Sequence, residues 1–208
     1  KTNIFHNLID TQMVMQKAAS GTGFKDVFSG IRILTVGRLT YQKGYDVAVH
    51  AMKELKAIKP ELKIHWYVLG EGPERDRISQ LIKKFGLEEE FILLGAVDNP
   101  FPYYSQADIY VHATRYEGKS IAIPEAKIFK CPIIASDCNG NREQVTHMEN
   151  GILCSFEPLE IAKSIAMMID SPELREKLRN HSETDRITEI EDLNSLYNLL
   201  GSDFYESI

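Results

Sequence analysis

The chain has few cysteines and lacks the histidine spacings that mark metal sites. Its three cysteines, Cys131, Cys138 and Cys154, form no C-x-x-C pair, and any disulfide would leave one thiol over, so we expect reduced cysteines. The six histidines show no H-x-x-x-H or H-x-x-E-H pattern. Because zinc sites usually show such spacings, we expect no protein-bound metal and no other cofactor.

The sequence also shows no long apolar run, no signal-peptide pattern and no excess of positive charge. No apolar run approaches the roughly 20 residues of a membrane span, and the start at Lys1 shows no signal-peptide pattern. We therefore expect a cytoplasmic location, with peripheral association at the inner face of the membrane as an alternative. The formal net charge of -6 argues against a general nucleic-acid binder. Any phosphate site must then be local.

What the sequence does contain is a repeated alternation of apolar strands and amphipathic helices. Strands are predicted where β-branched and apolar residues gather, at 31–36, 62–69, 91–94, 108–113, 132–136 and 151–154. Helices are predicted between and after them, at 47–58, 73–85, 102–106, 125–130, 159–169 and 172–179. This order predicts an α/β fold, a Rossmann-like doubly wound parallel sheet of about six strands with helices on both faces.

The pattern favours one main domain with a segment at each end. Residues 1–30 are less regular, with a helical stretch at 10–19, and we interpret them as a connector leading into the domain. Residues 31–182 hold the strand and helix alternation. Residues 183–208 contain a predicted helix at 187–200 with one apolar face. That face needs a partner, so we expect it to pack toward a domain that lies outside this chain.

Loops that follow the first five strands should meet at one edge of the sheet. They lie at 37–44, 70–73, 95–98, 117–125 and 137–141. Parallel strands bring their carboxyl ends to the same edge, and open α/β folds bind their ligands there. We therefore predict the functional site at this edge.

Two cations follow the first strand. Arg38 offers a planar fork of donors and Lys43 a compact charge, so the pair suits a diphosphate. Gly37 and Gly44 would let the backbone approach such a ligand closely. The alternative is that both cations are solvated loop residues, and their position at the carboxyl edge favours the ligand.

The loop after the fourth strand leads into a helix. Lys119, Ser120 and Ile121 are predicted at the start of that helix, where free backbone N–H groups can hold a phosphate oxygen. The alternative for Ser120 is that its side chain caps the helix. Both roles are compatible only if the ligand takes the remaining amides.

Two carboxylates bracket this loop. Glu125 lies near the first helical turn and can accept hydrogen bonds from a vicinal diol such as a ribose, although favourable charge at a helix N-terminus would also explain it. Glu117 ends a strand beside Gly118, where a ligand explains it better than a surface salt bridge. One loop supplies both carboxylates, so they do not resemble a glycosidase acid and nucleophile pair.

Three motifs in this order resemble the carboxyl-terminal half of retaining glycosyltransferases with the GT-B fold, of family 4 or group 1. They are Gly37-Arg38-Leu39 with Lys43-Gly44, the segment 69–74, and the E-x7-E motif of Glu117 and Glu125. The resemblance runs from about residue 31 to 178. It implies one half of a GT-B fold that binds a nucleoside-diphosphate sugar, with UDP favoured. It also implies retaining transfer of a hexosyl group to an acceptor hydroxyl in polysaccharide or glycolipid synthesis.

The resemblance also implies roles for single residues. Arg38, Lys43 and the amides of Ser120 and Ile121 would contact the diphosphate, Glu125 would hold the ribose, and Glu117 would be the catalytic candidate beside the donor sugar. The surroundings of the sugar or base would include Gly37, Gly72, Val97, Gly118 and Lys119. The family often has Phe-Gly-Leu after Glu-Gly, where this chain has Lys119-Ser120-Ile121, so the sugar is left open.

The expected partners are a nucleoside-diphosphate sugar and a glycan or glycolipid acceptor, without nucleic acid. In this family the acceptor site belongs to an amino-terminal domain, so the chain alone should not turn over. The cations would stabilise the leaving nucleoside diphosphate without a metal. Two alternatives stay open, a sugar-nucleotide epimerase of related two-domain fold and a non-catalytic nucleotide-binding module. A Rossmann oxidoreductase is disfavoured because the first strand leads into no G-x-G-x-x-G.

Overall fold

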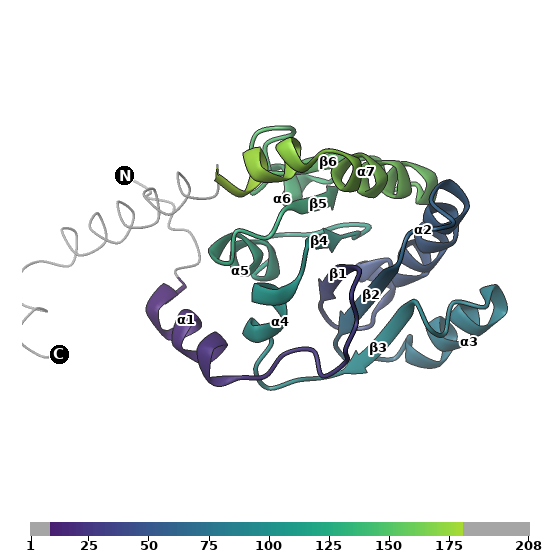
Figure 1. Cartoon of the computed structure of the whole chain (residues 1–208), viewed down its shortest axis with the longest axis horizontal. Helices are drawn as coiled ribbons and strands as arrows, with labels where there is room; N and C mark the ends of the chain where they lie inside the picture. The colour runs from purple at the N-terminus through teal and green to yellow at the C-terminus, as the bar shows by residue number, and fades with distance from the viewer. Residues whose placement is uncertain (1–8, 181–208) are drawn as a thin grey trace, which may run out of the picture.

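Within residues 9–180, the part that this computed structural model describes, six parallel strands form one sheet (Figure 1). They are β1 (Ile31–Val36), β2 (Ile64–Leu69), β3 (Phe91–Gly95), β4 (Ile109–His112), β5 (Ile133–Ser136) and β6 (Ile152–Cys154). Each predicted strand is present, with bounds that differ by at most two residues. The order β3-β2-β1-β4-β5-β6 is that of a Rossmann-like doubly wound fold, so the predicted fold class is confirmed.

Strand β1 lies at the point where the strand order reverses. It pairs with β2 along its whole length, from Ile31 to Val36. On its other side it pairs with β4 only through Ile33 and Leu34. The carboxyl ends of β1 and β4 are therefore not bridged by ladder hydrogen bonds, and the loops that leave them border the crevice of the sheet.

Helices connect the strands. The described ones are α1 (Thr11–Ser20), η1 (Tyr41–Lys43), α2 (Tyr45–Ile58), α3 (Arg75–Phe85), α4 (Phe101–Gln106), α5 (Ala122–Ile128), α6 (Asn139–Arg142), α7 (Pro158–Asp170) and a helical stretch at 172–180. Gly86 ends α3 in the left-handed conformation, with φ of 64°, as its place after the predicted helix suggested. Pro73 is the first residue of the helix predicted at 73–85, but it lies in a turn before α3 and not in the first turn of that helix, so this predicted bound was wrong. The two short helices η1 and α6 lie in segments predicted as loops.

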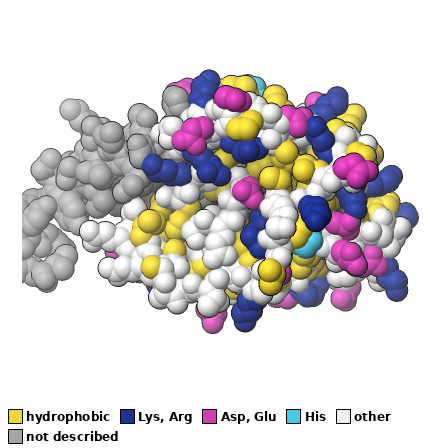
Figure 2. Space-filling model, in the orientation of Figure 1, with side chains coloured by type: hydrophobic (Ala, Val, Ile, Leu, Met, Phe, Trp, Pro, Cys, Tyr) yellow, Lys and Arg dark blue, Asp and Glu magenta, His cyan; other side chains and the backbone are white. Residues whose placement is uncertain are grey.

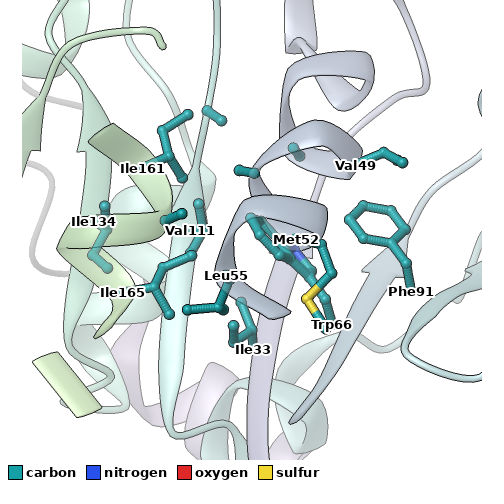
Figure 3. Packing of buried hydrophobic residues seen from close by; sticks show 14 of the residues in the cluster. Ile33, Val49, Met52, Leu55, Trp66, Phe91, Val111, Ile134, Ile161 and Ile165 are labelled. Carbon is teal, nitrogen blue, oxygen red and sulfur yellow. The ribbon is translucent and has the colours of Figure 1, made fainter. Parts of the chain in front are cut away.

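One face of the sheet is covered by α2, α3 and α7. Helix α2 directs Leu55 toward Ile165 of α7 and places Met52 over the strands (Figure 3). All three side chains are fully buried. Trp66 of β2 lies beneath α2, and its indole N–H donates to the hydroxyl of Thr35 at 2.9 Å, so this large side chain has its polar group satisfied.

The opposite face is covered by α4 and α5. Alternate residues of the strands point to it, as Tyr110 does between Ile109 and Val111, which point to the α2 side. Tyr104 of α4 packs on Tyr110, with 5.4 Å between the ring centroids. Both tyrosines are buried, so their hydroxyl groups need partners on this side of the sheet.

The segment before β1 is tied to the domain. Asp10 caps α1 by accepting a 2.9 Å hydrogen bond from the amide of Met13, and α1 packs on α4. Further along, Asp26 accepts from the guanidinium of Arg32 at 2.7 Å and from the hydroxyl of Tyr67. The predicted connector is therefore anchored on the domain over its described part.

Some predictions fall on residues 1–8 and 181–208, which lie outside the described part. They are the start of the connector predicted at 1–30 and the apolar helix predicted at 187–200. The expected packing of residues 183–208 toward another domain stays a prediction.

The surface carries mixed charge. On the face in Figure 2, basic and acidic side chains are interspersed. Of the helices described, none combines the length and apolar character needed to cross a membrane.

Candidate functional site

The loops after β1 and β4 are joined by hydrogen bonds across the crevice. The carbonyl of Gln42 accepts from the amide of Arg115 at 2.8 Å and from the hydroxyl of Thr114 at 2.9 Å. The side-chain amide of Gln42 donates to the carbonyl of Tyr116 at 3.0 Å. Segments about 74 positions apart in sequence are thereby fixed against each other at the predicted edge.

A charged cluster lies where these two loops meet. The ammonium of Lys43 donates to Oε2 of Glu117, and Nε2 of His112 lies 3.2 Å from the same oxygen. The Glu117 side chain is only 10% exposed and the Lys43 side chain 20%. The structure thus brings together two predicted site residues from different loops. It also shows that the salt bridge left open for Glu117 is formed, in a partly buried setting.

The surroundings of Glu117 keep it ionised. The hydrogen bond from His112, together with Lys43, lowers the pKa of Glu117 from 4.5 to about 2, although burial acts in the opposite direction. Burial lowers the pKa of His112. Near neutral pH the cluster therefore contains a glutamate anion, a lysine cation and a neutral imidazole. A carboxylate of such low basicity is a poor proton acceptor and suits an electrostatic role.

Glu125 lies in the first turn of α5, as predicted, on the side of the sheet covered by α4 and α5. The hydroxyl of Tyr104 donates to its Oε2 at 3.0 Å. Burial raises the pKa of Glu125, and the hydrogen bond from Tyr104 partly offsets this. Tyr104 thus fixes one carboxylate oxygen of Glu125.

The segment between the two carboxylates is held by Gln144. The amide of Ser120 donates to Oε1 of Gln144 at 2.9 Å, and Nε2 of Gln144 donates to the carbonyl of Ser120 at 2.8 Å. Ile121, not Ser120, is the N-cap residue of α5, and no side-chain hydrogen bond caps the helix. The capping alternative for Ser120 is therefore wrong. Its amide is occupied in this structure, whereas Ile121 is exposed.

Close backbone approach explains Gly140 of α6. A Cβ atom there would lie 2.0 Å from the carbonyl oxygen of Gly118, so only glycine fits against the loop. Gly118 itself is exposed and has open space around it. The loop of Glu117 therefore rests on α6 through a contact that the sequence pattern did not reveal.

A small hollow lies beside the crevice, at the ends of β1, β2 and β3. Its volume is about 190 Å³, and its lining is mainly aliphatic: Val36, Gly37, Leu69, Gly70, Ala96, Val97 and Pro100. Two residues predicted near the ligand, Gly37 and Val97, thus share one hollow. Gly72 lies elsewhere, against the backbone of Leu39, where a Cβ atom would come within 2.3 Å of the carbonyl oxygen. Gly72 has a structural reason for its small size.

The remaining predicted residues lie around the same edge. Arg38 is exposed, and its side chain has no hydrogen bond or ion pair with the residues that the structure describes. Lys119 is half-buried in the loop after Glu117. No cluster of three or more His, Cys, Asp or Glu side chains able to hold a metal ion occurs between residues 9 and 180.

Sequence reasoning missed four residues that support the site: Gln42, Tyr104, His112 and Gln144. The pair Tyr110 and His112 carried one usable signal, because two polar groups at spacing two in an apolar strand share one face. Nothing in the sequence pointed to the contact between Gln144 and Ser120, which joins positions 24 apart.

The strand order and the pairing of Lys43 with Glu117 define a Rossmann-like domain with a charged cluster at the topological switch point. The family model for "Glycosyl transferases group 1" matches residues 29–185. The chain therefore belongs to the group 1 glycosyltransferase family, and its fold is one half of a GT-B fold.

Similar proteins extend this result. The chain is 31% identical over 186 residues to an N-acetylgalactosaminyltransferase of Campylobacter jejuni that acts on a diphospho-undecaprenol-linked sugar, covering 88% of this chain and 48% of that protein. It is 30% identical over 157 residues to the amylovoran biosynthesis glycosyltransferase AmsD of Erwinia amylovora, covering 73% and 43%. The chain thus spans less than half the length of these two relatives.

Solved structures share the fold. The carboxyl-terminal domain of the group 1 protein LpcC of Francisella tularensis has a TM-score of 0.69 at 26% identity, covering 84% of this chain and 94% of that one. HepE of Anabaena, solved in complex with UDP and glucose, has a TM-score of 0.80 at 19% identity, covering 97% and 57%.

Proposed function

We propose that this chain is the donor-binding half of a retaining glycosyltransferase, which transfers a hexosyl group from a UDP-sugar to an acceptor hydroxyl in polysaccharide or glycolipid synthesis. The observation that carries the proposal is the meeting of Lys43 and Glu117 at the switch point of the sheet. The family membership, the names of the relatives and the UDP complex of a similar fold support it.

The nucleoside would occupy the edge formed by β1, β2 and β3. The aliphatic hollow that includes Val36 and Val97 suits the flat, largely apolar face of a base. Glu125 would accept hydrogen bonds from the ribose hydroxyls through the oxygen that Tyr104 leaves free.

The diphosphate would lie between the cations. Arg38 is exposed and has a fork of donors that fits phosphate oxygens. The Lys43 ammonium has three N–H donors, so it can keep its hydrogen bond to Glu117 and still donate to a phosphate oxygen. Since Gln144 occupies the amide of Ser120, the backbone contact would fall on Ile121.

Glu117 would face the donor sugar as an anion. Its low pKa favours stabilisation of developing positive charge and acceptance of a sugar hydroxyl over proton abstraction. Arg38 and Lys43 would stabilise the leaving nucleoside diphosphate, and we propose that this needs no metal. A region of the protein outside this sequence would bind the acceptor. We propose that the protein works in the cytoplasm, with the inner face of the membrane as a second location.

Calorimetric titration of UDP, GDP and NAD against the chain tests the proposal. We expect UDP to bind with a Kd between about 1 mM and 1 μM. Arg38→Ala and Glu125→Ala should each weaken binding by about tenfold, because each removes a hydrogen bond to or from a charged group.

Matched controls are Lys56→Ala and Glu61→Ala. Glu61 is exposed before β2, and Lys56 pairs with Glu90 before β3, both at the amino edge of the sheet. They should bind UDP as the wild type does. Absence of nucleoside-diphosphate binding, or equal losses in controls and site variants, would refute the donor-site proposal, and preferential binding of NAD would favour another enzyme class.

A further inference from the structure

We propose that His112 is a positioning residue: with its proton on Nε2 it orients Glu117, and Tyr110 fixes it in that form. The inference rests on the proposed function, because the gain from a fixed Glu117 is a preformed acceptor for the donor sugar. His112 does not face the ligand itself. It would act through the carboxylate.

The geometry isolates His112 from solvent and gives each ring nitrogen one partner. The side chain is 2% exposed. Its Nδ1 lies 3.2 Å from the hydroxyl of Tyr110, and its Nε2 lies 3.2 Å from Oε2 of Glu117. The charged groups that face it are Glu117 and Lys43, both from loops at the carboxyl edge. Tyr110 shares its strand and its face of the sheet.

The partners determine the tautomer. Glu117 is ionised and can only accept hydrogen bonds, so the imidazole must carry a proton on Nε2. Burial keeps the ring neutral, so Nδ1 must be the acceptor. The hydroxyl of Tyr110 is then the donor to Nδ1. The carbonyl of Val36 is its more distant acceptor, at 3.5 Å.

This arrangement uses the two carboxylate oxygens of Glu117 differently. Oε2 receives Lys43 and His112, which fix the position of the carboxylate. Oε1 has the side-chain amide of Gln42 at 3.5 Å, the limit of a hydrogen bond, as its contact among the described residues. One oxygen thus anchors the side chain, and the other is presented to a ligand hydroxyl.

Imidazole nitrogen NMR tests the tautomer without any ligand. At about pH 7 the His112 signal of the wild type should be that of a neutral imidazole with its proton on Nε2. The signal is assigned by its loss in His112→Gln. Tyr110→Phe should shift this histidine toward a mixture of tautomers. A proton on Nδ1, or a doubly protonated ring near neutral pH, would overturn the inference.

Binding of UDP-glucose, UDP-galactose and their N-acetyl derivatives, compared with UDP, tests the role. A UDP-sugar should bind more tightly than UDP, and the ratio of the two affinities is the sugar gain. His112→Leu should reduce the sugar gain by about tenfold. His112→Gln should retain it within about threefold, since the glutamine amide reaches the place of Nε2 and can donate to Glu117. UDP alone should bind all variants within about twofold.

The proposed function and the role of His112 are tested by separate results. If the wild type binds no UDP, the proposed function fails, while the NMR experiment still tests the tautomer of His112. Equal losses of UDP and UDP-sugar affinity in His112→Leu would show that His112 only supports the fold, and this would overturn the positioning role. An unchanged sugar gain in His112→Leu would also overturn it. Should His112→Leu not fold, Tyr110→Phe, which keeps the volume of the side chain, replaces it and must reduce the sugar gain.

Discussion

Replacing Glu117 by glutamine should destabilise the protein in a pH-dependent way. The folded protein lowers the pKa of Glu117 from 4.5 to about 2 through His112 and Lys43. At about 1.4 kcal/mol per pKa unit, the ionised form contributes about 3 kcal/mol to the free energy of unfolding. The side chain is 10% exposed, so solvent screens this contribution little.

The sign of the effect follows from the lowered pKa. The contribution is complete above the unfolded-state pKa of 4.5 and is lost as the pH falls toward the folded-state value of about 2. Glu117→Gln has no charge to lose. Wild type and variant should therefore differ by about 3 kcal/mol near pH 7 and converge as the pH falls below about 4.

Urea unfolding followed by tryptophan fluorescence measures this difference. Trp66 is the single tryptophan of the chain and is fully buried, so its emission reports loss of the core. Exposed Glu61 supplies the control Glu61→Gln, which should match the wild type at each pH. A difference between wild type and Glu117→Gln that stays constant from about pH 7 to about pH 3 would refute the electrostatic reasoning, since lost packing does not titrate.

Three further substitutions, one of them with a control substitution beside it, test the supports of the site and the core. Gly140→Ala should cost about 2 kcal/mol or more, because its Cβ atom would meet the carbonyl oxygen of Gly118 at 2.0 Å, whereas Gly118→Ala, with open space around it, should stay within about 0.5 kcal/mol in thermal or urea unfolding. Gln144→Leu leaves the buried amide and carbonyl of Ser120 unpaired, so it should cost about 2 to 4 kcal/mol and speed hydrogen exchange of the Ser120 amide; unchanged exchange would contradict this. Leu55→Ala should cost about 2 to 5 kcal/mol in urea unfolding, since Leu55 is fully buried between the sheet and α7, and a smaller loss would mean that the core refills the space.

The fold was predictable because its signals are local. The run from Ile31 to Val36 is rich in apolar and β-branched residues and is followed by glycine, and its predicted bounds agree with those of β1. Parallel topology then followed from the alternation with helices, without knowledge of any contact. Pro73 is a less specific signal for where a helix begins, because proline is favoured both in the first turn of a helix and in the turn that precedes it.

Only those features of the site that follow from the parallel topology were predictable. That Lys43 and Glu117 share an edge follows from parallel strands, but their direct pairing depends on β1 and β4 being neighbours. No local sequence pattern determines the strand order. For the same reason His112 looked like an ordinary strand residue, because its partner Glu117 follows a turn whose path the sequence does not define.

The occupied amide of Ser120 shows a second limit. A helix start predicts free N–H groups in general, but whether one of them is free depends on what lies beside it. Gln144 comes from the loop that follows α6, 24 positions later. Such a contact depends on tertiary placement, which spacing along the chain does not record.

The joining of the loops after β1 and β4 has a consequence for how the protein acquires its site. Gln42 and Tyr116 are 74 positions apart, so the crevice has high contact order and cannot close until β4 has docked beside β1. A growing chain that has not yet passed Tyr116 has a partial sheet and no site. A ligand held by both loops would then bind only forms in which β4 has docked beside β1, and by mass action it would favour these forms over less folded ones.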